Sequence, residues 1–475
     1  MSKTGSRSYV FVKKLIIENF KSIKRLELPL KPGVNLLVGP NASGKTNILE
    51  AIYFLYKALV EEAGKMPYMP HSPRYWSPLD ILYGRNVENI LKYEIFLDHY
   101  LVNKKNEVYR NEIVYKVFFR ISPDKSTILP VYHRIEYGKD TSITVSYEGI
   151  EVNMLRHTME KLMERLKKRS RIEPWLKQLK DIISHAKVSG EYLKIRTAWE
   201  REAFMPSAPL MPPPALGMST REEGFIAGTL FIPFVKPPVI PFAYRLEKSN
   251  RKELKGVMVE IPGVLSLEEL FASVMRKIIL LKHPDIGALR EPKLMAGRME
   301  RLDERATNLA LVMLSIQGKK GGLPPRIIEA LRRLFPSIKV RLDMHYGRAA
   351  LVAEENGLEL PPPNMPDGLF KLLAILSAIE LEPSILLIDE IENSMHARML
   401  ELIIDELNSL KIPVIVASHS PVVVDLVGAE RTLIVKKDPI KGTLIEVLEK
   451  PEELYKKLDE IGVTLSDYIF YRRTY

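Results

Sequence analysis

The chain has 475 residues, 46% of them hydrophobic, and a formal net charge of +11, so its length predicts two or three domains with substantial cores. It contains no cysteine, which excludes disulfides, thiolate metal sites and a cysteine nucleophile. The sequence shows neither a signal peptide nor an apolar run of the roughly 18 residues that a membrane span needs, which predicts a cytoplasmic protein with no membrane partner. Abundant Lys, Arg and Glu and scarce glutamine are typical of a thermophile.

The first distinctive segment is an apolar strand that runs into a glycine-rich loop, residues 39–46, which reads G-x-x-x-x-G-K-T. In such a loop the backbone N–H groups close on phosphates, Lys45 reaches the β- and γ-phosphates, and the Thr46 hydroxyl binds Mg²⁺. Residues 47–60 are apolar at helical spacing, which places the phosphates at a helix N-terminus. The residues expected to bind ATP here are Gly39, Pro40, Asn41, Ala42, Ser43, Gly44, Lys45, Thr46 and Asn47.

The middle of the chain falls into stretches of different character. Residues 90–150 alternate apolar and polar positions, which predicts antiparallel strands. Helices are expected at about 151–170 and 174–187, and because no long heptad array follows, any arm is a short helical insertion. Residues 205–243 are dense in proline, typical of a linker or an extended loop. Further helices are expected at 265–282 and 299–318.

The helix expected from about 151 carries a basic run at 161–171. Together with the net charge of +11, this run indicates a nucleic-acid partner such as DNA. A lysine-rich thermophile surface would give a similar total charge, and the helical spacing of Leu and Met describes an exposed arm helix equally well. The candidate nucleic-acid contacts are Lys161, Arg165, Lys167, Lys168, Arg169 and Arg171.

A second apolar run, residues 384–388, ends in two carboxylates, Asp389 and Glu390. Buried parallel strands read as continuous aliphatic runs, and their carboxyl ends deliver side chains to the ligand crevice. This pattern is a Walker B strand, in which Asp389 holds Mg²⁺, usually through water, and Glu390 polarises the attacking water as general base. Together with Lys45, Glu390 is therefore an expected catalytic residue.

Two histidines near this strand have different interpretations. His419 follows an apolar strand at 412–417, directly downstream of Walker B, and this position favours a γ-phosphate sensor with a catalytic role. Glu392 and His396 have the i, i+4 spacing of metal ligands, but no third ligand is visible, which favours a loop and a helix start.

The two nucleotide motifs lie far apart, since Thr46 and Asp389 are separated by 343 positions (389 minus 46). The nucleotide-binding fold is therefore split between the two ends of the chain. Strands around 34–38, 384–388 and 412–416 are expected in one sheet, which would bring Thr46 and Asp389 close enough to share a Mg²⁺.

These residues resemble the SMC/RecF-like branch of ABC-type ATPases. The resemblance rests on residues 15–23 before the loop, on 389–396 as a joined Walker B and D-loop, on 416–421 with the switch histidine, and on 307–314 before a strand pair at 338–353. It covers about 10–60 and 300–435. It implies an α/β fold, a split ABC-type P-loop ATPase head with an antiparallel β subdomain and a helical insertion. The implied domains are 1–150, 151–300 and 301–475.

The chain departs from the family pattern at two places. The signature, commonly Leu-Ser-Asp-Gly in RecF-like members, is Met365-Pro366-Asp367-Gly368 here, so the serine that donates to the γ-phosphate across the dimer is a proline. Asp367, Gly368 and the following helix could still present N–H groups to a phosphate. The Q-loop glutamine is also missing, because the two glutamines, Gln178 and Gln317, do not follow the first helix.

The resemblance implies an enzyme that hydrolyses ATP with Mg²⁺ in an ATP-dependent homodimer and acts on nucleic acid, in repair, chromosome maintenance or defence. One alternative is an ATPase subunit that gates a separate nuclease or toxin effector. OLD-type members carry a C-terminal nuclease domain, for which the 54 residues after Pro421 (475 minus 421) are too few. Another alternative is an ATP-binding switch with little turnover, given Pro366 and the missing glutamine.

Overall fold

The computed structural model describes residues 7–58, 77–102, 108–121, 128–138, 141–146, 149–155, 187–189, 192–198, 277–295, 297 and 299–471. The chain forms two compact units, one of Met1–Pro29 with Phe54–Arg276 and one of Leu30–Tyr53 with Lys277–Tyr475. The second unit therefore joins the glycine-rich loop to the C-terminal part of the chain. The domain boundaries expected from the sequence, 1–150, 151–300 and 301–475, stay a prediction.

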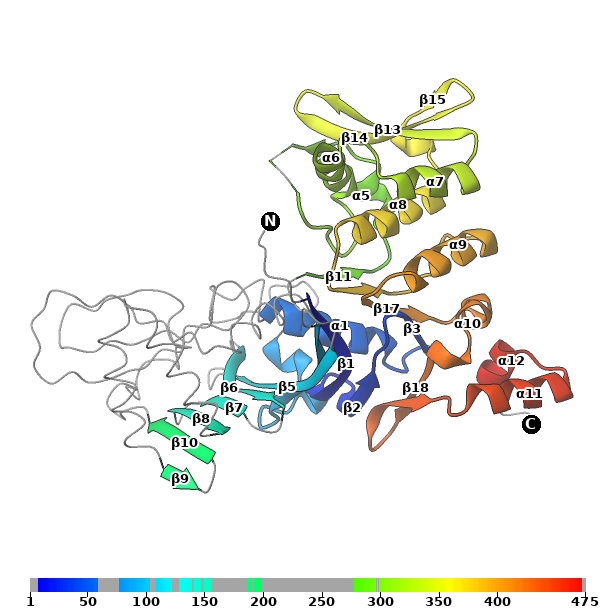
Figure 1. The fold of residues 1–475 in the computed structure, drawn as a ribbon. Helices are drawn as coiled ribbons and strands as arrows, with labels where there is room; N and C mark the ends of the chain where they lie inside the picture. The colour runs from blue at the N-terminus through cyan, green and yellow to red at the C-terminus, as the bar shows by residue number, and fades with distance from the viewer. Residues whose placement is uncertain are drawn as a thin grey trace, which may run out of the picture. The chain divides into compact units, whose positions relative to one another are not determined.

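The second unit is built on a sheet that is parallel over most of its strands (Figure 1). Its order is β11-β16-β17-β3-β18-β19, and β19 alone of these runs antiparallel to its neighbour. The strands are β3 (Gly33–Val38), β11 (Ile278–Leu281), β16 (Ile385–Ile388), β17 (Pro413–Ser418), β18 (Thr432–Asp438) and β19 (Gly442–Val447). The expectation that β3, β16 and β17 share one sheet is confirmed.

Helices bury one face of this sheet. Alternate residues of β3, β11, β16 and β17 form a single apolar core with α6, α7, α8, α9 and α10, as expected where helices pack on a parallel sheet. The helices of this unit are α5 (Ile286–Leu289), α6 (Leu309–Lys320), α7 (Pro325–Leu334), α8 (Asp367–Glu380), α9 (Ala397–Asn408), α10 (Pro421–Val427), α11 (Pro451–Ile461) and α12 (Leu465–Tyr471), with short 3₁₀ turns η5 (Pro362–Asn364) and η6 (Ala429–Arg431). Helix α1 (Lys45–Tyr56) starts within the glycine-rich loop.

A small antiparallel sheet lies over α6 and α7 (Figure 1). Its main pair confirms the strand pair expected at 338–353. Its strands are β12 (Lys293–Leu294), β13 (Ile338–His345), β14 (Arg348–Glu355) and β15 (Leu358–Leu360).

The first unit is an antiparallel sheet in the order β2-β1-β4-β5-β6-β7-β8-β10-β9, which confirms the strands expected over 90–150. Four aromatic side chains, Phe20, Phe54, Tyr93 and Phe119, fill its core with ring centroids 5.6 to 6.4 Å apart. The elements are β1 (Arg7–Phe20), β2 (Ile23–Pro29), η2 (Pro78–Ile81), η3 (Tyr83–Arg85), β4 (Leu91–Val102), β5 (Val108–Ile121), β6 (Ile128–Tyr137), β7 (Thr141–Ser146), β8 (Gly149–Leu155), β9 (Lys187–Ser189) and β10 (Tyr192–Ala198).

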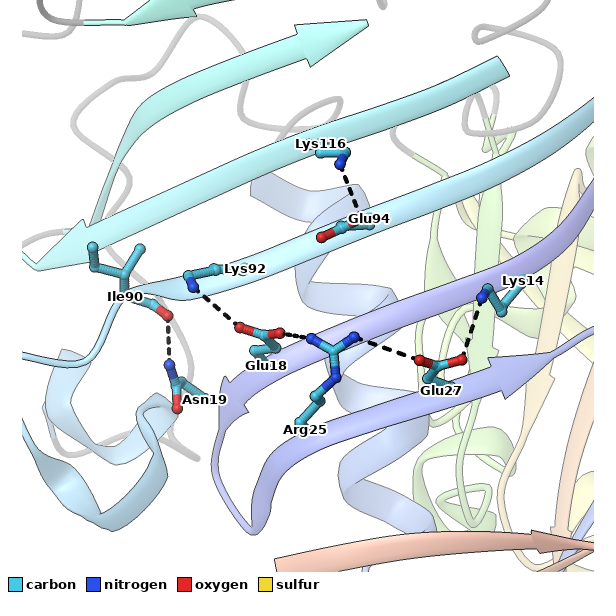
Figure 2. A network of polar contacts seen from close by, with 9 residues as sticks. All are labelled: Lys14, Glu18, Asn19, Arg25, Glu27, Ile90, Lys92, Glu94 and Lys116. Carbon is cyan, nitrogen blue, oxygen red and sulfur yellow. Dashed lines mark hydrogen bonds and ion pairs between the residues drawn. The ribbon is translucent and has the colours of Figure 1, made fainter. Parts of the chain in front are cut away.

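Ion pairs cross the strands of the first unit in a chain of alternating charge (Figure 2). Glu18 accepts from Lys92 at 3.2 Å and from Arg25, and Arg25 in turn lies 3.5 Å from Glu27. The last contact of the chain joins Glu27 to Lys14 at 3.2 Å. Such opposite-charge pairs favour the observed strand register, although each exposed pair contributes only ~0.2–1 kcal/mol.

Three of the expected helices are corrected by the structure. Residues 149–155 form β8, not the start of a helix at 151, because Ile150, Val152 and Met154 alternate with polar residues and the segment pairs with β7 and β10. Residues 278–281 form β11, not the end of a helix at 265–282, because this aliphatic run pairs with β16. The helix expected at 299–318 begins only at Leu309.

Three expected segments lie outside the described residues: the basic run at 161–171, the helix at 174–187 except for its last residue, Lys187, which begins β9, and the proline-rich stretch at 205–243. Among the residues that are described, no helix has both the length and the apolar character that crossing a membrane requires.

Helix α8 is buried along almost its whole length and carries one lysine into the core. Lys371 is 2% exposed, and its Nζ donates to the backbone carbonyl of Glu390 at 2.6 Å. Burial lowers the pKa of Lys371 to about 8, and the charges of Glu392, Glu390 and Asp389 oppose that shift. The ammonium thus ties α8 to the carboxyl end of β16 in an environment that costs it free energy.

The Lys371→Met variant tests this burial through pH. Between pH 8 and 10.5 the folded chain has released the Lys371 proton, whereas the unfolded chain still holds it. The free energy of unfolding of the parent should therefore rise relative to that of Lys371→Met across this window, by at most ~1.4 kcal/mol per pH unit. Below pH 8 the difference between the two proteins should not change with pH. Chemical denaturation at a series of pH values measures this difference.

Lys411→Met is the matched control, because Lys411 is exposed. Its stability profile should run parallel to that of the parent. If the stability profile of Lys371→Met also ran parallel to that of the parent, this would contradict a lowered pKa of Lys371.

Candidate nucleotide-binding site

The glycine-rich loop connects β3 to α1 with no intervening residues beyond the motif itself. Gly39 must be glycine, because a Cβ there would lie 2.2 Å from the backbone oxygen of Val435. The turn closes through a hydrogen bond from Ser43 N to Pro40 O at 3.2 Å. Ala42 and Gly44 have positive φ values, 62° and 108°, and left-handed residues in a tight loop let successive N–H groups converge on one anion.

Lys45 bends back over this loop. Its Nζ donates to Gly39 O at 2.7 Å and to Pro40 O at 3.1 Å. Burial lowers the pKa of Lys45, while the carboxylates of Asp389, Glu392 and Glu390 oppose that shift. Its ammonium therefore already lies at the loop, where a phosphate can replace the two carbonyl oxygens as acceptor.

The two Walker motifs meet at the side chains of Thr46 and Asp389. Asp389 follows β16 and is 8% exposed. Burial raises the pKa of Asp389, and a hydrogen bond with the Thr46 side chain, together with the charge of Lys282, lowers it. Residues 343 positions apart thus interact within a single unit, and that they share a Mg²⁺ stays a prediction.

This pair fits Mg²⁺. A hydroxyl and one carboxylate are a donor set that Mg²⁺ takes when phosphates and water complete its shell. No group of three or more His, Cys, Asp or Glu that could enclose a metal occurs in the part of the chain that the structure describes. The Thr46 and Asp389 side chains thus fit Mg²⁺ only with further ligands such as phosphate and water oxygens.

Glu390 follows Asp389 in an unusual backbone conformation, with φ at 51°. A non-glycine residue in this region costs on the order of 1–3 kcal/mol, so its surroundings must hold it. Lys371 and the backbone N–H of Asn393 both donate to the Glu390 carbonyl, at 2.6 and 3.2 Å. The Asn393 side chain donates to Oε2 at 2.5 Å, which fixes the exposed carboxylate beside the buried one.

His419 is held by Glu392, a residue with no role among those expected from the sequence. Glu392 Oε1 accepts the backbone N–H of His419 at 2.9 Å and lies 3.1 Å from its Nδ1. His396 instead caps α9, since its Nδ1 accepts from Met399 N at 3.3 Å. Glu392 and His396 therefore belong to a loop and a helix start, as expected.

The signature-like segment leads into α8. Pro366 is the N-cap residue, and its side chain makes no capping hydrogen bond. Arg290 donates to Asp367 Oδ1 at 2.8 Å and to Met365 O at 3.3 Å, which anchors the segment within its own unit. Gly368 must be glycine, because a Cβ there would lie 2.7 Å from the backbone oxygen of Ser394. The segment is thus packed directly on the loop that follows Walker B.

Several residues of the site had no signal in the sequence. Lys282 follows β11 and pairs with Glu50 of α1, 232 positions away in the sequence. Because a helix was expected at 265–282, the sequence did not predict that Lys282 lies at the end of a strand. Glu392 and Arg290 are recognised as residues of the site only because the structure shows them in contact with His419 and Asp367. Of the two glutamines, Gln317 lies on α6, and Gln178 is outside the described residues, as are the six candidate nucleic-acid residues.

Two family models match the chain, one over each end. A model described as "AAA ATPase domain" matches residues 11–197. A model described as "AAA domain, putative AbiEii toxin, Type IV TA system" matches residues 281–425. The first covers the glycine-rich loop, and the second covers Walker B and His419.

Curated relatives match over a short segment. The DNA replication and repair protein RecF of Roseiflexus castenholzii is 51% identical over 55 residues, which are 12% of this chain and 14% of the relative. RecF of Lactobacillus acidophilus is 48% identical over 46 residues, 10% of this chain and 12% of the relative. The chain thus spans only a small part of the length of these relatives.

Among solved structures, an SMC head bound to the C-winged helix domain of ScpA has a TM-score of 0.44 and 14% identity, over 94% of this chain and 99% of that chain. The SMC head domain from Thermotoga maritima has a TM-score of 0.37 and 12% identity, over 92% and 99%. These overall likenesses are weak. The two ATPase family models and the local likeness to RecF, together with Walker motifs joined in one unit, support an SMC/RecF-like ABC-type ATPase.

Proposed function

We propose that this chain binds ATP together with Mg²⁺ and hydrolyses it. The observation that carries the proposal is the contact of Thr46 with Asp389, which brings a hydroxyl and a carboxylate from opposite ends of the chain to the edge of the phosphate-binding loop. The two ATPase family models, which match residues 11–197 and 281–425, support it.

The proposed roles follow from where each side chain lies. The loop 39–47 and the ammonium of Lys45 would hold the phosphates, and Thr46 and Asp389 would hold Mg²⁺, which supplies charge compensation for the phosphates when bound. Glu390, whose Oε2 accepts from the Asn393 side chain at 2.5 Å, would accept a proton from water. His419 is the proposed contact to the γ-phosphate.

We further propose that ATP closes a homodimer. The signature-like segment supports this part, because Pro366 and Asp367 are exposed at the N-terminus of α8, where backbone N–H groups can receive a phosphate from a second copy. Pro366 brings no hydroxyl to that contact, so the backbone and Gly368 would carry it. A weak contact of this kind fits slow turnover, the alternative in which ATP acts mainly as a switch.

The partner of the ATPase has two candidates. DNA is supported by the net charge of +11 and by the local likeness to RecF, which is named as a DNA replication and repair protein. A separate effector protein is the second candidate, and a role in a toxin–antitoxin system is supported by the second family model, described as "AAA domain, putative AbiEii toxin, Type IV TA system". Stimulation of ATP hydrolysis by DNA favours the first candidate, and co-purification of one effector from the native host favours the second.

Replacing Lys45 by Ala should abolish ATP binding. The substitution removes the cation nearest the loop and leaves phosphate charge uncompensated, a loss of about 2–4 kcal/mol for a charge-assisted contact. Titration with a fluorescent ATP analogue measures the affinity, with Lys411→Ala at an exposed lysine as the control. Parental affinity in Lys45→Ala would show that ATP does not bind at this loop.

Replacing Glu390 by Gln should leave ATP bound but slow its hydrolysis by about 10²-fold or more, because a positioned general base contributes ~10²–10⁴-fold. Phosphate release at saturating ATP, with and without DNA, gives the rate. His419→Ala should slow hydrolysis less. The assignment of the base would be wrong if Glu390→Gln turned over at the parental rate.

A further inference from the structure

One carboxylate of the site, that of Glu392, has none of the proposed roles in binding or hydrolysis. Glu392 is 12% exposed, and one of its oxygens, Oε1, contacts His419 twice. Its other oxygen, Oε2, is buried and has no hydrogen-bond partner among the described residues. Burying a carboxylate with one oxygen that has no hydrogen bond costs free energy. A glutamate at this position therefore needs a physical reason.

The charge of Glu392 reaches other residues of the site. It acts on Lys45 of the phosphate-binding loop and on Lys371 of α8, and at both residues it counteracts the effect of burial on the ammonium. Glu392 thus interacts with three of the motifs: the loop, the signature-like helix and the switch histidine. These attractions offset part of the cost of the unsatisfied oxygen.

The geometry fixes both the backbone and the ring of His419. The backbone N–H donates to Oε1 at 2.9 Å, and Nδ1 lies 3.1 Å from the same atom. An ionised carboxylate can only accept hydrogen bonds, so Nδ1 must carry the hydrogen in this contact. Nε2 is then the ring nitrogen left for a ligand, on a side chain that is 48% exposed.

We propose that Glu392 is a positioning residue for His419: it holds the ring by accepting from Nδ1–H, so that Nε2, when it also carries a proton, donates to the γ-phosphate. The inference rests on the proposed function, because it assumes that His419 contacts the nucleotide. Glu392 itself is proposed to contact neither the nucleotide nor the metal. Its main effect on turnover should pass through His419, the residue that it contacts directly.

Three variants separate this role from a general structural one. Glu392→Ala removes both contacts and should lower kcat by roughly 10- to 100-fold, the cost of a misplaced catalytic group, with little change in ATP affinity. Glu392→Gln should restore most of the rate, because its amide oxygen can accept the same two hydrogens. Glu401→Ala, at an exposed glutamate of α9, should behave as the parent.

A double-mutant cycle gives the decisive comparison. In the His419→Ala background, adding Glu392→Ala should have no further effect on kcat, since residues that act as one unit are not additive. A further loss equal to that of the single variant would overturn the proposal, as would a parental kcat in Glu392→Ala.

A readout without activity keeps this inference apart from the proposed function. Nitrogen NMR of ¹⁵N-histidine-labelled protein reports which ring nitrogen of His419 carries the hydrogen. The parent and Glu392→Gln should show hydrogen on Nδ1, and Glu392→Ala should lose that preference. An unchanged His419 signal in Glu392→Ala would overturn the inference, whereas a parent that hydrolyses no ATP would overturn only the proposed function.

Discussion

The parallel pairing of β17 with β3 is the constraint on which the rest of the site depends. It aligns Val414 with Val34 and Ser418 with Val38, segments that are 380 positions apart in the chain (414 minus 34). Asn408 supports the junction by accepting from Val34 N at 3.2 Å. Because the carboxyl ends of parallel strands share one edge, this pairing places the phosphate-binding loop beside His419, and the parallel pairing of β16 with β17 adds Walker B to the same edge. Without it the chain would hold two half sites.

Electrostatics then decide how that edge is arranged. Asp389, Glu390 and Glu392 put three carboxylates within four positions, a charge density that needs nearby cations. Lys45 and Lys371 supply them, and each is affected by all three acids. Two ammonium groups therefore offset most of the charge of the three carboxylates before any ligand arrives. A nucleotide with Mg²⁺ brings both anionic and cationic groups, so it can exchange partners with these residues without leaving a buried charge unpaired.

The sequence predicted the parts of the site that lie within single motifs, such as Lys45, Thr46 and Asp389, because their spacing is dictated by phosphate and metal geometry. It also predicted which strands share a sheet. It missed β11, since a four-residue aliphatic run has no period that tells strand from helix. It gave Glu392 no role, because the partner of Glu392 lies 27 positions away and only the fold joins them.

The central claim is that residues from the two ends of the chain share one ion. The most direct measurement is ATP affinity with and without Mg²⁺ for the parent, Thr46→Val, Asp389→Asn and the double variant. If both side chains hold the same Mg²⁺, either single change should remove most of the Mg²⁺-dependent gain, and the double variant should lose little more, a coupling of about 0.5–3 kcal/mol. Additive losses, or an Asp389→Asn variant that keeps the full Mg²⁺ effect, would contradict a shared site.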